Sequence, residues 1–163
     1  MKQELSVCWF RRDLRLTDHA ALYHALKSGR PVLPIFIFDK NILDKLEDKD
    51  DKRVAFIHQS ITRMQQQLLT MGSTMQVFYT TPAVAFKQLA EQYTIKAVFT
   101  NHDYEPYAKQ RDDMIANYLL SVGCSFTTYK DQVIFEKDEV IKDDGKPYSV
   151  FTPYSRRWKA LLN

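Results

Sequence analysis

PVLPIFIF, residues 31–38, is the stretch of this sequence that decides its fold. Apart from its two prolines it is a continuous apolar run, with no alternation of polar and apolar residues. A strand with one face in water alternates, whereas a strand covered on both faces is apolar throughout. The run therefore predicts a β-strand in a parallel sheet that has helices on both faces.

Other apolar runs of strand length lie before and after it, at residues 5–10, 75–79, 97–100 and 125–129. Stretches of helical period separate them, at residues 18–27, 52–71, from 82 onward, and 106–123. Thr17 or Asp18 is the expected N-cap of the first helix, and glycines are the expected stop signals of three helices. This alternation predicts an α/β fold: a doubly wound, five-stranded parallel sheet of Rossmann-like or HUP-like type with helices on both faces.

Ligands of doubly wound sheets bind beyond the carboxyl ends of the strands, where the strand order reverses. In this sequence that rule selects three loops, at residues 11–17, 39–43 and 101–107. Neither the GxGxxG pattern nor the GxxxxGK[ST] pattern occurs in them or elsewhere in the chain. Nucleotide binding in the ordinary dinucleotide or P-loop manner is therefore disfavoured.

Composition and charge indicate an ordinary cytoplasmic domain. The 163 residues are 45% hydrophobic with a net charge of +3, which suits one core and is too weakly basic for a dedicated nucleic-acid arm. No CxxC or Cys/His cluster accompanies Cys8 and Cys124, so we expect reduced, buried thiols and no metal site. No apolar run is long enough for a signal peptide or a membrane span, so we expect a soluble chain with no membrane partner.

Three segments carry a resemblance to a known family. VCWFRRDLRL, residues 7–16, followed by TDHAAL, resembles the opening signature of the photolyase/cryptochrome family, in which a strand ends in W-F-R-x-D-L-R-x-x-D-N. DYEPYAKQRD, residues 103–112, resembles the family's EPY-x-x-x-RD helix start. PYSVFTP, residues 147–153, resembles its Y-x-V-F-T-P-F/Y segment. The three occur in family order, so the resemblance covers essentially the whole chain.

The resemblance implies the N-terminal domain of a two-domain enzyme, a deoxyribodipyrimidine photolyase. In that family a C-terminal helical domain binds FAD and repairs cyclobutane pyrimidine dimers in damaged DNA by light-driven electron transfer. That domain is not in this chain, so we expect no catalytic residues and no lyase activity in the chain alone. The expected partners are the FAD-binding domain and, through it, damaged DNA. A cryptochrome photoreceptor domain and a stand-alone nucleotide- or flavin-binding module remain open as alternatives.

The expected domain boundary follows from the same resemblance. Residues 1–130 are expected to form the α/β domain, and residues 131–163 a linker and the start of the connection to the helical domain. The end of the chain reads as an aromatic and basic helix that awaits its partner. Its aromatic run is expected to be exposed in the isolated chain, with Tyr148, Phe151, Tyr154 and Trp158 as members.

In the family this domain holds an antenna chromophore, and the resemblance extends to six residues of that site. Members that bind 8-hydroxy-deazaflavin resemble this chain at Arg12, Phe36, Phe38, Asp39, Asp103 and Glu105. Aromatic faces can stack on a planar tricycle, and charged groups can fix its polar edges. Folate-type members carry an Asn-Glu pair where this chain has Tyr107 and Ala108, so 8-hydroxy-deazaflavin is favoured. Methenyltetrahydrofolate, FMN and a site without any antenna stay open as alternatives.

Several of these residues also have a purely structural interpretation. Phe36 and Phe38 are two apart in a strand and face the same side, so both belong to the core or both line one pocket wall. Asp39 can be a turn or cap residue. Glu105 can complement the positive end of the helix that follows it.

The arginines and histidines are interpreted in the same way. At least one of Arg11, Arg12 and Arg15 is expected to hold its loop through paired hydrogen bonds to a carboxylate or to backbone carbonyls. Arg12 alone is a binding candidate, and phosphate binding by the cluster stays open. The four histidines share neither a spacing nor a neighbouring nucleophile, which speaks against a hydrolytic triad and indicates surface positions.

Overall fold

The structure, a computed structural model, describes residues 2–48 and 50–162. It divides the chain into two units, Met1–Tyr129 and Lys130–Asn163. The first unit contains the whole sheet and the helices that cover it, and the second contains a short 3-10 helix and one α-helix.

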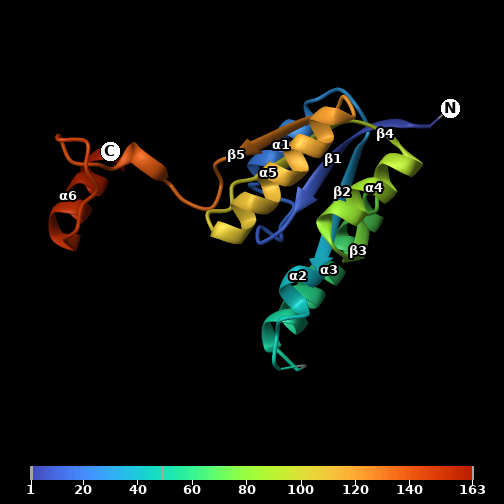
Figure 1. Cartoon of the computed structure of the whole chain (residues 1–163), viewed down its shortest axis with the longest axis horizontal. Coiled ribbons are helices and arrows are strands. Elements are labelled where there is room, and N and C mark those ends of the chain that lie inside the picture. Colours follow the sequence, from blue (N-terminus) through green and yellow to red (C-terminus); the bar gives the residue numbers. More distant parts are fainter. Residues whose placement is uncertain (1, 49, 163) are drawn as a thin grey trace. The chain divides into compact units, whose positions relative to one another are not determined.

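The first unit is built on a five-stranded sheet in which every pair of neighbouring strands is parallel (Figure 1). The strands are β1 (Glu4–Phe10), β2 (Val32–Asp39), β3 (Gln76–Thr80), β4 (Thr94–Asn101) and β5 (Ser125–Tyr129). Their order is β3-β2-β1-β4-β5, so the chain winds outward from β1 in one direction and continues from β4 in the other. The winding reverses between β1 and β4, and the fold class expected from the sequence is confirmed.

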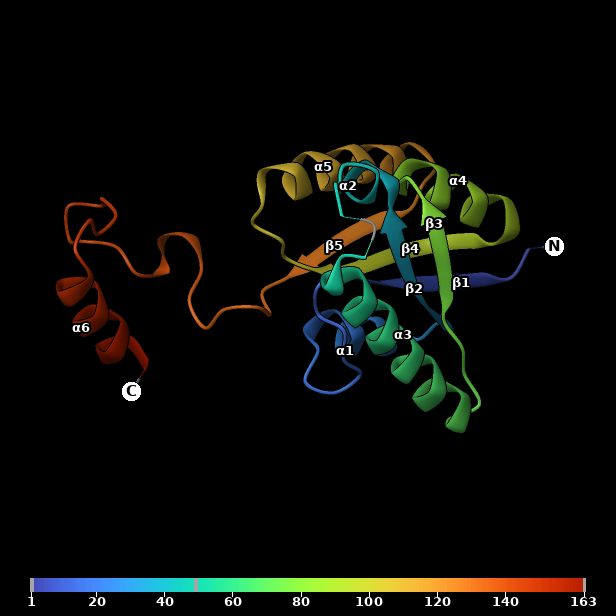
Figure 2. The ribbon, with the colours of Figure 1, turned by 90° about the horizontal axis from the view of Figure 1, so that it is seen from below.

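Helices cover both faces of the sheet (Figure 2). They are α1 (Ala20–Leu26), α2 (Lys40–Leu43), α3 (Lys52–Thr70), α4 (Pro82–Gln92) and α5 (Pro106–Ser121). α1 and α3 bury their apolar residues against one face, and α4 and α5 bury theirs against the other. This double cover is the physical reason for the continuous apolar run in β2.

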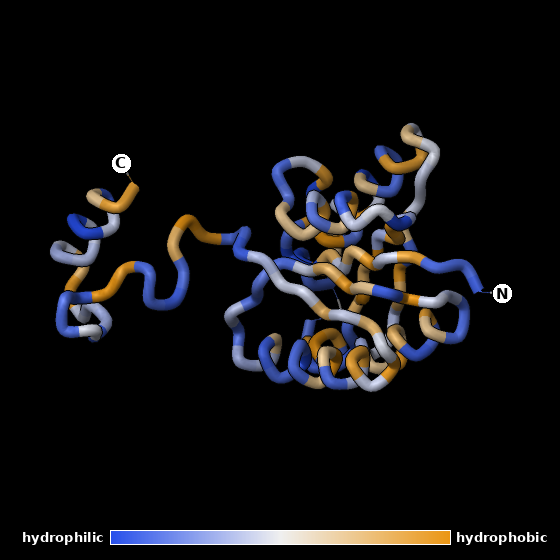
Figure 3. Tube along the Cα trace, turned by 90° about the horizontal axis from the view of Figure 1, so that it is seen from above, coloured by the Kyte–Doolittle hydropathy of each residue, from blue (hydrophilic) through white to orange (hydrophobic). Residues whose placement is uncertain are grey.

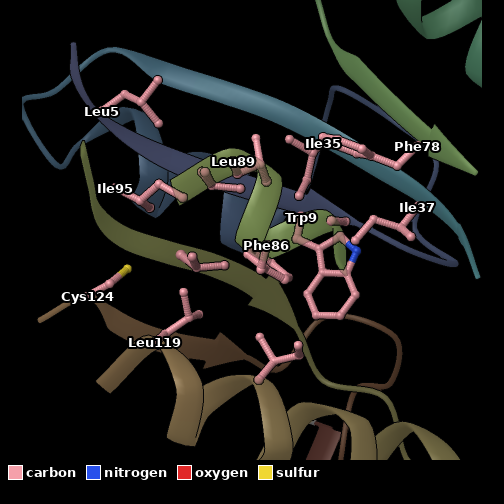
Figure 4. Close-up of a cluster of buried hydrophobic side chains, with 14 residues drawn as sticks. Leu5, Trp9, Ile35, Ile37, Phe78, Phe86, Leu89, Ile95, Leu119 and Cys124 are labelled. Carbon is pink, nitrogen blue, oxygen red and sulfur yellow. The ribbon is translucent and has the colours of Figure 1, made fainter. Parts of the chain in front are cut away.

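The core consists of one hydrophobic cluster on each face of the sheet. Trp9 lies at the centre of the cluster under α4 and α5, where its ring meets Phe86 edge-on with the ring centroids 5.2 Å apart (Figure 4). Hydrophobic residues follow the central strands, whereas much of the peripheral chain is hydrophilic (Figure 3). Burial of a large apolar side chain contributes about 2–3 kcal/mol, so this packing firmly anchors the end of β1.

The start of α1 differs from the sequence prediction. Its N-cap is His19, whose Nδ1 accepts a hydrogen bond from the backbone N–H of Leu22 at 3.0 Å. The prediction of Thr17 or Asp18 was wrong because Ser, Thr, Asp and Asn are the usual caps and histidine is not. The surface position expected for the histidines is also wrong for His19, which is only 5% exposed.

A short helix also stands where the sequence indicated a loop. Residues 40–43 form α2, and Asp39 is its N-cap, accepting the N–H of Asn41 at 2.9 Å. Four residues are too few to show a helical period in the sequence. The interpretation of Asp39 as a cap residue is therefore confirmed. The chain after β2 turns directly into a helix and not into a loop.

The helix ends agree with the sequence, because α3 and α5 stop at glycine as expected. Gly123 has a φ of +73°, and its N–H binds the carbonyl of Leu120 at 3.1 Å. The N–H of Cys124 binds the carbonyl of Leu119 at 2.9 Å, which completes a Schellman motif. Gly72 ends α3 with the same geometry, at a φ of +71°.

The second unit has little hydrophobic core. It contains the 3-10 helix η1 (Lys137–Glu139) and α6 (Phe151–Leu162). The rings of Phe135 and Trp158 meet edge-on with their centroids 5.6 Å apart, and those of Tyr148 and Tyr154 do so with their centroids 6.1 Å apart. The expectation that the whole aromatic run is exposed is therefore wrong for three of its members, which are half-buried, and right for Phe151, which is 78% exposed.

Candidate functional site

A cavity of about 370 Å³ opens beyond the carboxyl ends of β1 and β2 and beside the segment that joins β4 to α5. This is the position at which a doubly wound sheet binds its ligands. Five parts of the chain line it: the end of β1 with its loop, the end of β2, the segment from α2 into α3, the segment before α5, and the first turns of α5. The lining residues are Trp9, Arg11, Arg12, Phe36, Ile37, Phe38, Asp39, Ile42, Leu43, Leu46, Arg53, Val54, Ile57, Asp103, Glu105, Tyr107, Ala108 and Arg111.

One wall of the cavity is charged. Arg12, in the loop after β1, lies 3.6 Å from Asp103 Oδ1 and 3.6 Å from Glu105 Oε1, both in the segment before α5. The side chains of Arg12 and Glu105 are 58% and 66% exposed, whereas that of Asp103 is 7% exposed. These pairs lie beyond hydrogen-bond distance and two of the three groups are exposed, so Arg12 and Glu105 can exchange partners readily.

Asp39 connects the end of β2 to α5. Its Oδ1 caps α2, and its Oδ2 accepts the hydroxyl of Tyr107 at 2.5 Å. The amide of Asn41 donates to the same hydroxyl at 3.1 Å. Burial raises the pKa of Tyr107, and the hydrogen bond to Asp39 raises it further, so the phenol stays protonated and Asp39 stays the acceptor. Asp39 is thus both structural and a cavity residue.

Another part of the cavity lining is aromatic and aliphatic. Phe36 and Phe38 meet edge-on with centroids 4.9 Å apart, and both line the cavity. Phe36 is 5% exposed and belongs to the core, and Phe38 packs against the same cluster. The core interpretation and the pocket interpretation of this pair are therefore both correct, because these core side chains also form part of the cavity wall. Side chains of α2, the residues after it and α3 complete an apolar wall, with Ile42, Leu43, Leu46, Val54 and Ile57 as members.

Two buried arginines share one carboxylate beneath the charged wall. Arg11 Nη1 lies 2.6 Å from each carboxylate oxygen of Asp112, and Arg11 Nη2 donates to the backbone carbonyl of Asn101. Arg111 Nε donates to Asp112 Oδ1 at 3.0 Å. Both guanidinium groups lie over the ring of Trp9. The distance from Cζ to the ring centroid is 5.2 Å for Arg11 and 4.9 Å for Arg111. Because these groups are held on several sides, this part of the site is preformed.

A buried polar network fixes the loop after β1. Asp13 Oδ1 accepts the N–H of Arg11 at 2.9 Å, and its Oδ2 lies 2.6 Å from Asn101 Nδ2 and 2.8 Å from His19 Nε2. Burial raises the pKa of Asp13, but the hydrogen bonds from His19 and from Arg11 outweigh burial and lower this pKa to about 2. His19 Nδ1 accepts from Leu22, so the ring proton lies on Nε2 and points to Asp13. The carboxylate of Asp13 is therefore the central hydrogen-bond acceptor that holds this loop in place.

The expected loop-holding role is confirmed for two arginines. Arg11 holds Asp112 and the end of β4, and Arg15 donates from Nε and Nη2 to the carbonyl of Asp18, at 3.0 and 2.6 Å. Asp18 has a φ of +50°, a conformation that aspartate tolerates better than most residues. Arg12 is left as the exposed member of the three and points its charge toward the cavity residues Asp103 and Glu105.

All six residues selected from the sequence lie along one cavity, with Arg12, Phe36, Phe38, Asp39, Asp103 and Glu105 as members. Their role in binding a chromophore stays a prediction. Sequence reasoning missed Trp9 and Arg111 as lining residues and treated Tyr107 only as a replacement for a folate contact. Tyr107 and Arg111 are four apart on α5 and therefore share one helix face, which is the signal that could have found them.

The described residues contain no cluster of three or more His, Cys, Asp or Glu side chains that could hold a metal ion. Burial raises the pKa of Cys8 well above its usual value and that of Cys124 to about 11, so neither thiol is a ready metal ligand or nucleophile. Within the same part of the chain, no helix combines the length and apolar character needed to cross a membrane.

Comparison with known proteins identifies the family. The sequence model of the DNA photolyase family matches residues 6–163. A deoxyribodipyrimidine photo-lyase of Synechococcus sp. is 33% identical over 152 residues, which cover 93% of this chain and 31% of the relative. The crystal structure of a bacterial class III photolyase from Agrobacterium tumefaciens superposes with a TM-score of 0.84 at 25% identity, over 100% of this chain and 32% of that one.

An archaeal photolyase from Sulfolobus tokodaii is also similar, with a TM-score of 0.82 and 26% identity over 94% of this chain and 34% of its own. That structure is described as containing two FAD molecules, with the implication of a novel light-harvesting cofactor. This chain spans about a third of the length of these relatives. The chain belongs to the photolyase/cryptochrome family, in which it corresponds to the N-terminal α/β domain of a DNA photolyase.

Proposed function

We propose that this domain binds a planar antenna chromophore in the cavity beyond β1 and β2, with 8-hydroxy-deazaflavin as the favoured compound and FMN and methenyltetrahydrofolate as competitors. The observation that carries the proposal is the chemistry of the cavity walls. Charged residues of the loop after β1 and of the segment before α5 line the same cavity as apolar residues of α2 and α3, and Phe36 and Phe38 supply aromatic surface. A planar tricyclic ring with a polar pyrimidinedione edge and a largely hydrocarbon benzene ring matches this arrangement.

The size of the cavity supports the same proposal. About 370 Å³ lies within the ~300–1,000 Å³ typical of small-molecule sites, near the lower end. Such a volume suits a fused ring system, whereas the nucleotide part of a large cofactor would have to lie outside it. Tyr107 and Ala108 favour a flavin-like ring over folate, because the hydroxyl of Tyr107 is already bound to Asp39 and Ala108 offers no polar group.

We place the light-driven chemistry outside this chain. Because the chain spans about a third of its relatives, FAD binding and the repair of pyrimidine dimers in DNA are proposed for a longer protein that contains a helical domain. In that protein the antenna would pass excitation to FAD. A cryptochrome would use the same cavity, and a dimer-repair assay on the full-length protein separates the two.

The test is an absorbance and fluorescence titration of the purified domain with 8-hydroxy-deazaflavin, methenyltetrahydrofolate and FMN. We expect saturable binding of one compound, weakened about tenfold or more by Asp39→Ala, since a hydrogen bond to a charged group contributes about 1.5–3 kcal/mol. Asp39→Ala also removes the cap of α2, so its circular dichroism spectrum and melting temperature must be recorded.

A second variant avoids this complication, because Glu105 makes no side-chain cap on α5 and its side chain is 66% exposed. Glu105→Gln should weaken binding with only a small change in melting temperature, because its charge is exposed. Asp113→Asn, an equal change of charge at an exposed position of the same helix outside the cavity, is the matched control. A folded domain that binds none of the three compounds would refute the proposal.

A further inference from the structure

Arg111 differs from the other charged residues of the cavity in having a buried donor without an acceptor. The residue is 7% exposed and lies on α5, one turn after Tyr107. Its Nη2 is buried and makes no hydrogen bond within the described part of the chain. Buried donors are almost always paired in folded proteins, so an unpaired donor in a cavity wall points to a ligand.

The surroundings of Nη2 show why the protein itself does not supply the acceptor. Asp112 Oδ1 lies 2.9 Å away as an ion-pair contact, but hydrogen-bond geometry is not met, and this carboxylate already binds Arg11 Nη1 with both oxygens. Asp103 Oδ2 lies 3.9 Å away, which is beyond hydrogen-bond distance. Two guanidinium groups thus share one close carboxylate, which leaves Arg111 Nη2 without a hydrogen-bond acceptor of its own among the described residues.

Arg11 provides an internal comparison. It lines the same cavity, lies over the same Trp9 ring and binds the same Asp112. Its Nη1 is satisfied by Asp112, however, and its Nη2 by the carbonyl of Asn101. A purely structural role therefore accounts for both terminal nitrogens of Arg11. The same role leaves Nη2 of Arg111 without a hydrogen-bond acceptor in the part of the chain that the structure describes.

The position of Arg111 is also fixed. Its guanidinium lies 4.9 Å from the centroid of Trp9 and 5.9 Å from that of Tyr107, and its Nε is held by Asp112. With the group held between two rings and a carboxylate, Nη2 cannot readily turn toward bulk water. An acceptor must instead come to it from the cavity.

We propose that Arg111 binds a ring carbonyl oxygen of the ligand and so selects the orientation in which the ligand lies. This inference rests on the proposed antenna function. The charged wall carries donors on Arg111 and Arg12 and acceptors on Asp103 and Glu105. The pyrimidinedione edge that flavins and deazaflavins share presents carbonyl, N–H and carbonyl in sequence, which complements such a wall. The other edge of the tricycle, a dimethylbenzene in FMN and a phenol in 8-hydroxy-deazaflavin, would then lie toward α2 and α3.

The test uses ligands in which one ring carbonyl oxygen is replaced by sulfur, a weaker acceptor of almost the same shape. The dissociation constants of FMN, 2-thio-FMN and 4-thio-FMN are compared, and the same replacements are made in 8-hydroxy-5-deazariboflavin. We expect one thio analogue to bind wild-type protein about tenfold more weakly than its parent, and Arg111→Met to reduce this discrimination to less than about twofold. Lys109→Met is the matched control, since it removes a positive charge from an exposed position of α5 outside the cavity.

Arg111→Lys serves as a second variant in case Arg111→Met fails to fold. Lysine keeps the charge beside Asp112 and Trp9 but lacks the guanidinium fork, so discrimination should still fall. Loss of affinity by the same factor for parent and thio analogues in either variant would overturn the role of Arg111 and leave the antenna function standing. Absence of binding of every parent compound to folded wild-type protein would overturn both proposals.

Discussion

Substitution of Asp13 by asparagine should destabilise the domain strongly although the side chain keeps its shape. The carboxylate accepts three hydrogen bonds, from the N–H of Arg11 at 2.9 Å, from Asn101 Nδ2 at 2.6 Å and from His19 Nε2 at 2.8 Å. In Asp13→Asn one oxygen becomes an NH₂ group, which would face the donors of Asn101 and His19. The loop after β1, which carries Arg11 and Arg12, would lose its central acceptor.

The magnitude follows from the pKa of Asp13. One pKa unit is equivalent to about 1.4 kcal/mol, so a carboxyl group whose pKa falls from 3.8 to about 2 on folding contributes about 2 kcal/mol. An unsatisfied buried donor costs about 1–3 kcal/mol more. We therefore expect Asp13→Asn to lower the free energy of unfolding by about 3–4 kcal/mol and the melting temperature by roughly 10 °C.

Urea unfolding followed by circular dichroism measures this loss, and its pH dependence identifies the cause. The folded-state pKa of Asp13 is below the unfolded one, so the contribution is complete above about pH 4 and disappears as the pH falls toward 2. The difference between wild type and Asp13→Asn should therefore be largest at neutral pH and shrink below pH 4. Asp113→Asn, the same change at an exposed position, should alter stability by less than about 0.5 kcal/mol.

Two results would refute the reasoning. One is a loss below 1 kcal/mol at pH 7, which would mean that the three hydrogen bonds are not made or are replaced by water. The other is a loss that stays constant from pH 7 to pH 2.5, which would mean that the charge on Asp13 does not contribute.

Two further predictions concern the helix ends and the thiols. Gly123→Ala should cost about 1 kcal/mol in urea unfolding with an unchanged m-value, because φ is +73° and a Cβ there meets no atom within 4 Å, so backbone conformation is the whole cost; no loss of stability would contradict the Schellman geometry. Cys8 and Cys124 should react with a thiol reagent at pH 8 only slowly in the folded protein and at once in urea, because burial raises the pKa of both. Rapid labelling of native protein would contradict this.

The fold could be predicted from the sequence because its main signals are local. The apolar run of β2, the helical period of α3 and the glycine after α5 each act within a few residues of themselves. The positions of the cavity residues were also accessible, since parallel strands bring their carboxyl ends to one edge of the sheet.

What the sequence could not provide are contacts that depend on tertiary geometry. His19 caps α1 because Asp13 and Asn101, far apart in the chain, hold its ring in place. Tyr107 is a partner of Asp39 only because the tertiary fold brings the start of α5 close to the end of β2. The sharing of Asp112 by two arginines, and with it the unpaired nitrogen of Arg111, likewise follows from packing and from no local pattern.

The side-chain caps of α1 have a consequence for amide hydrogen exchange. The first N–H groups of a helix usually face water and exchange within moments. Here the N–H of Ala21 is bound to Asn101 Oδ1 at 2.9 Å and that of Leu22 to His19 Nδ1 at 3.0 Å, and both bonds are buried. Asn101 belongs to β4, so these two amides can exchange only when the helix start separates from the sheet. The exchange rate of these two amides would therefore report how often the loop that carries Arg11 and Arg12 opens.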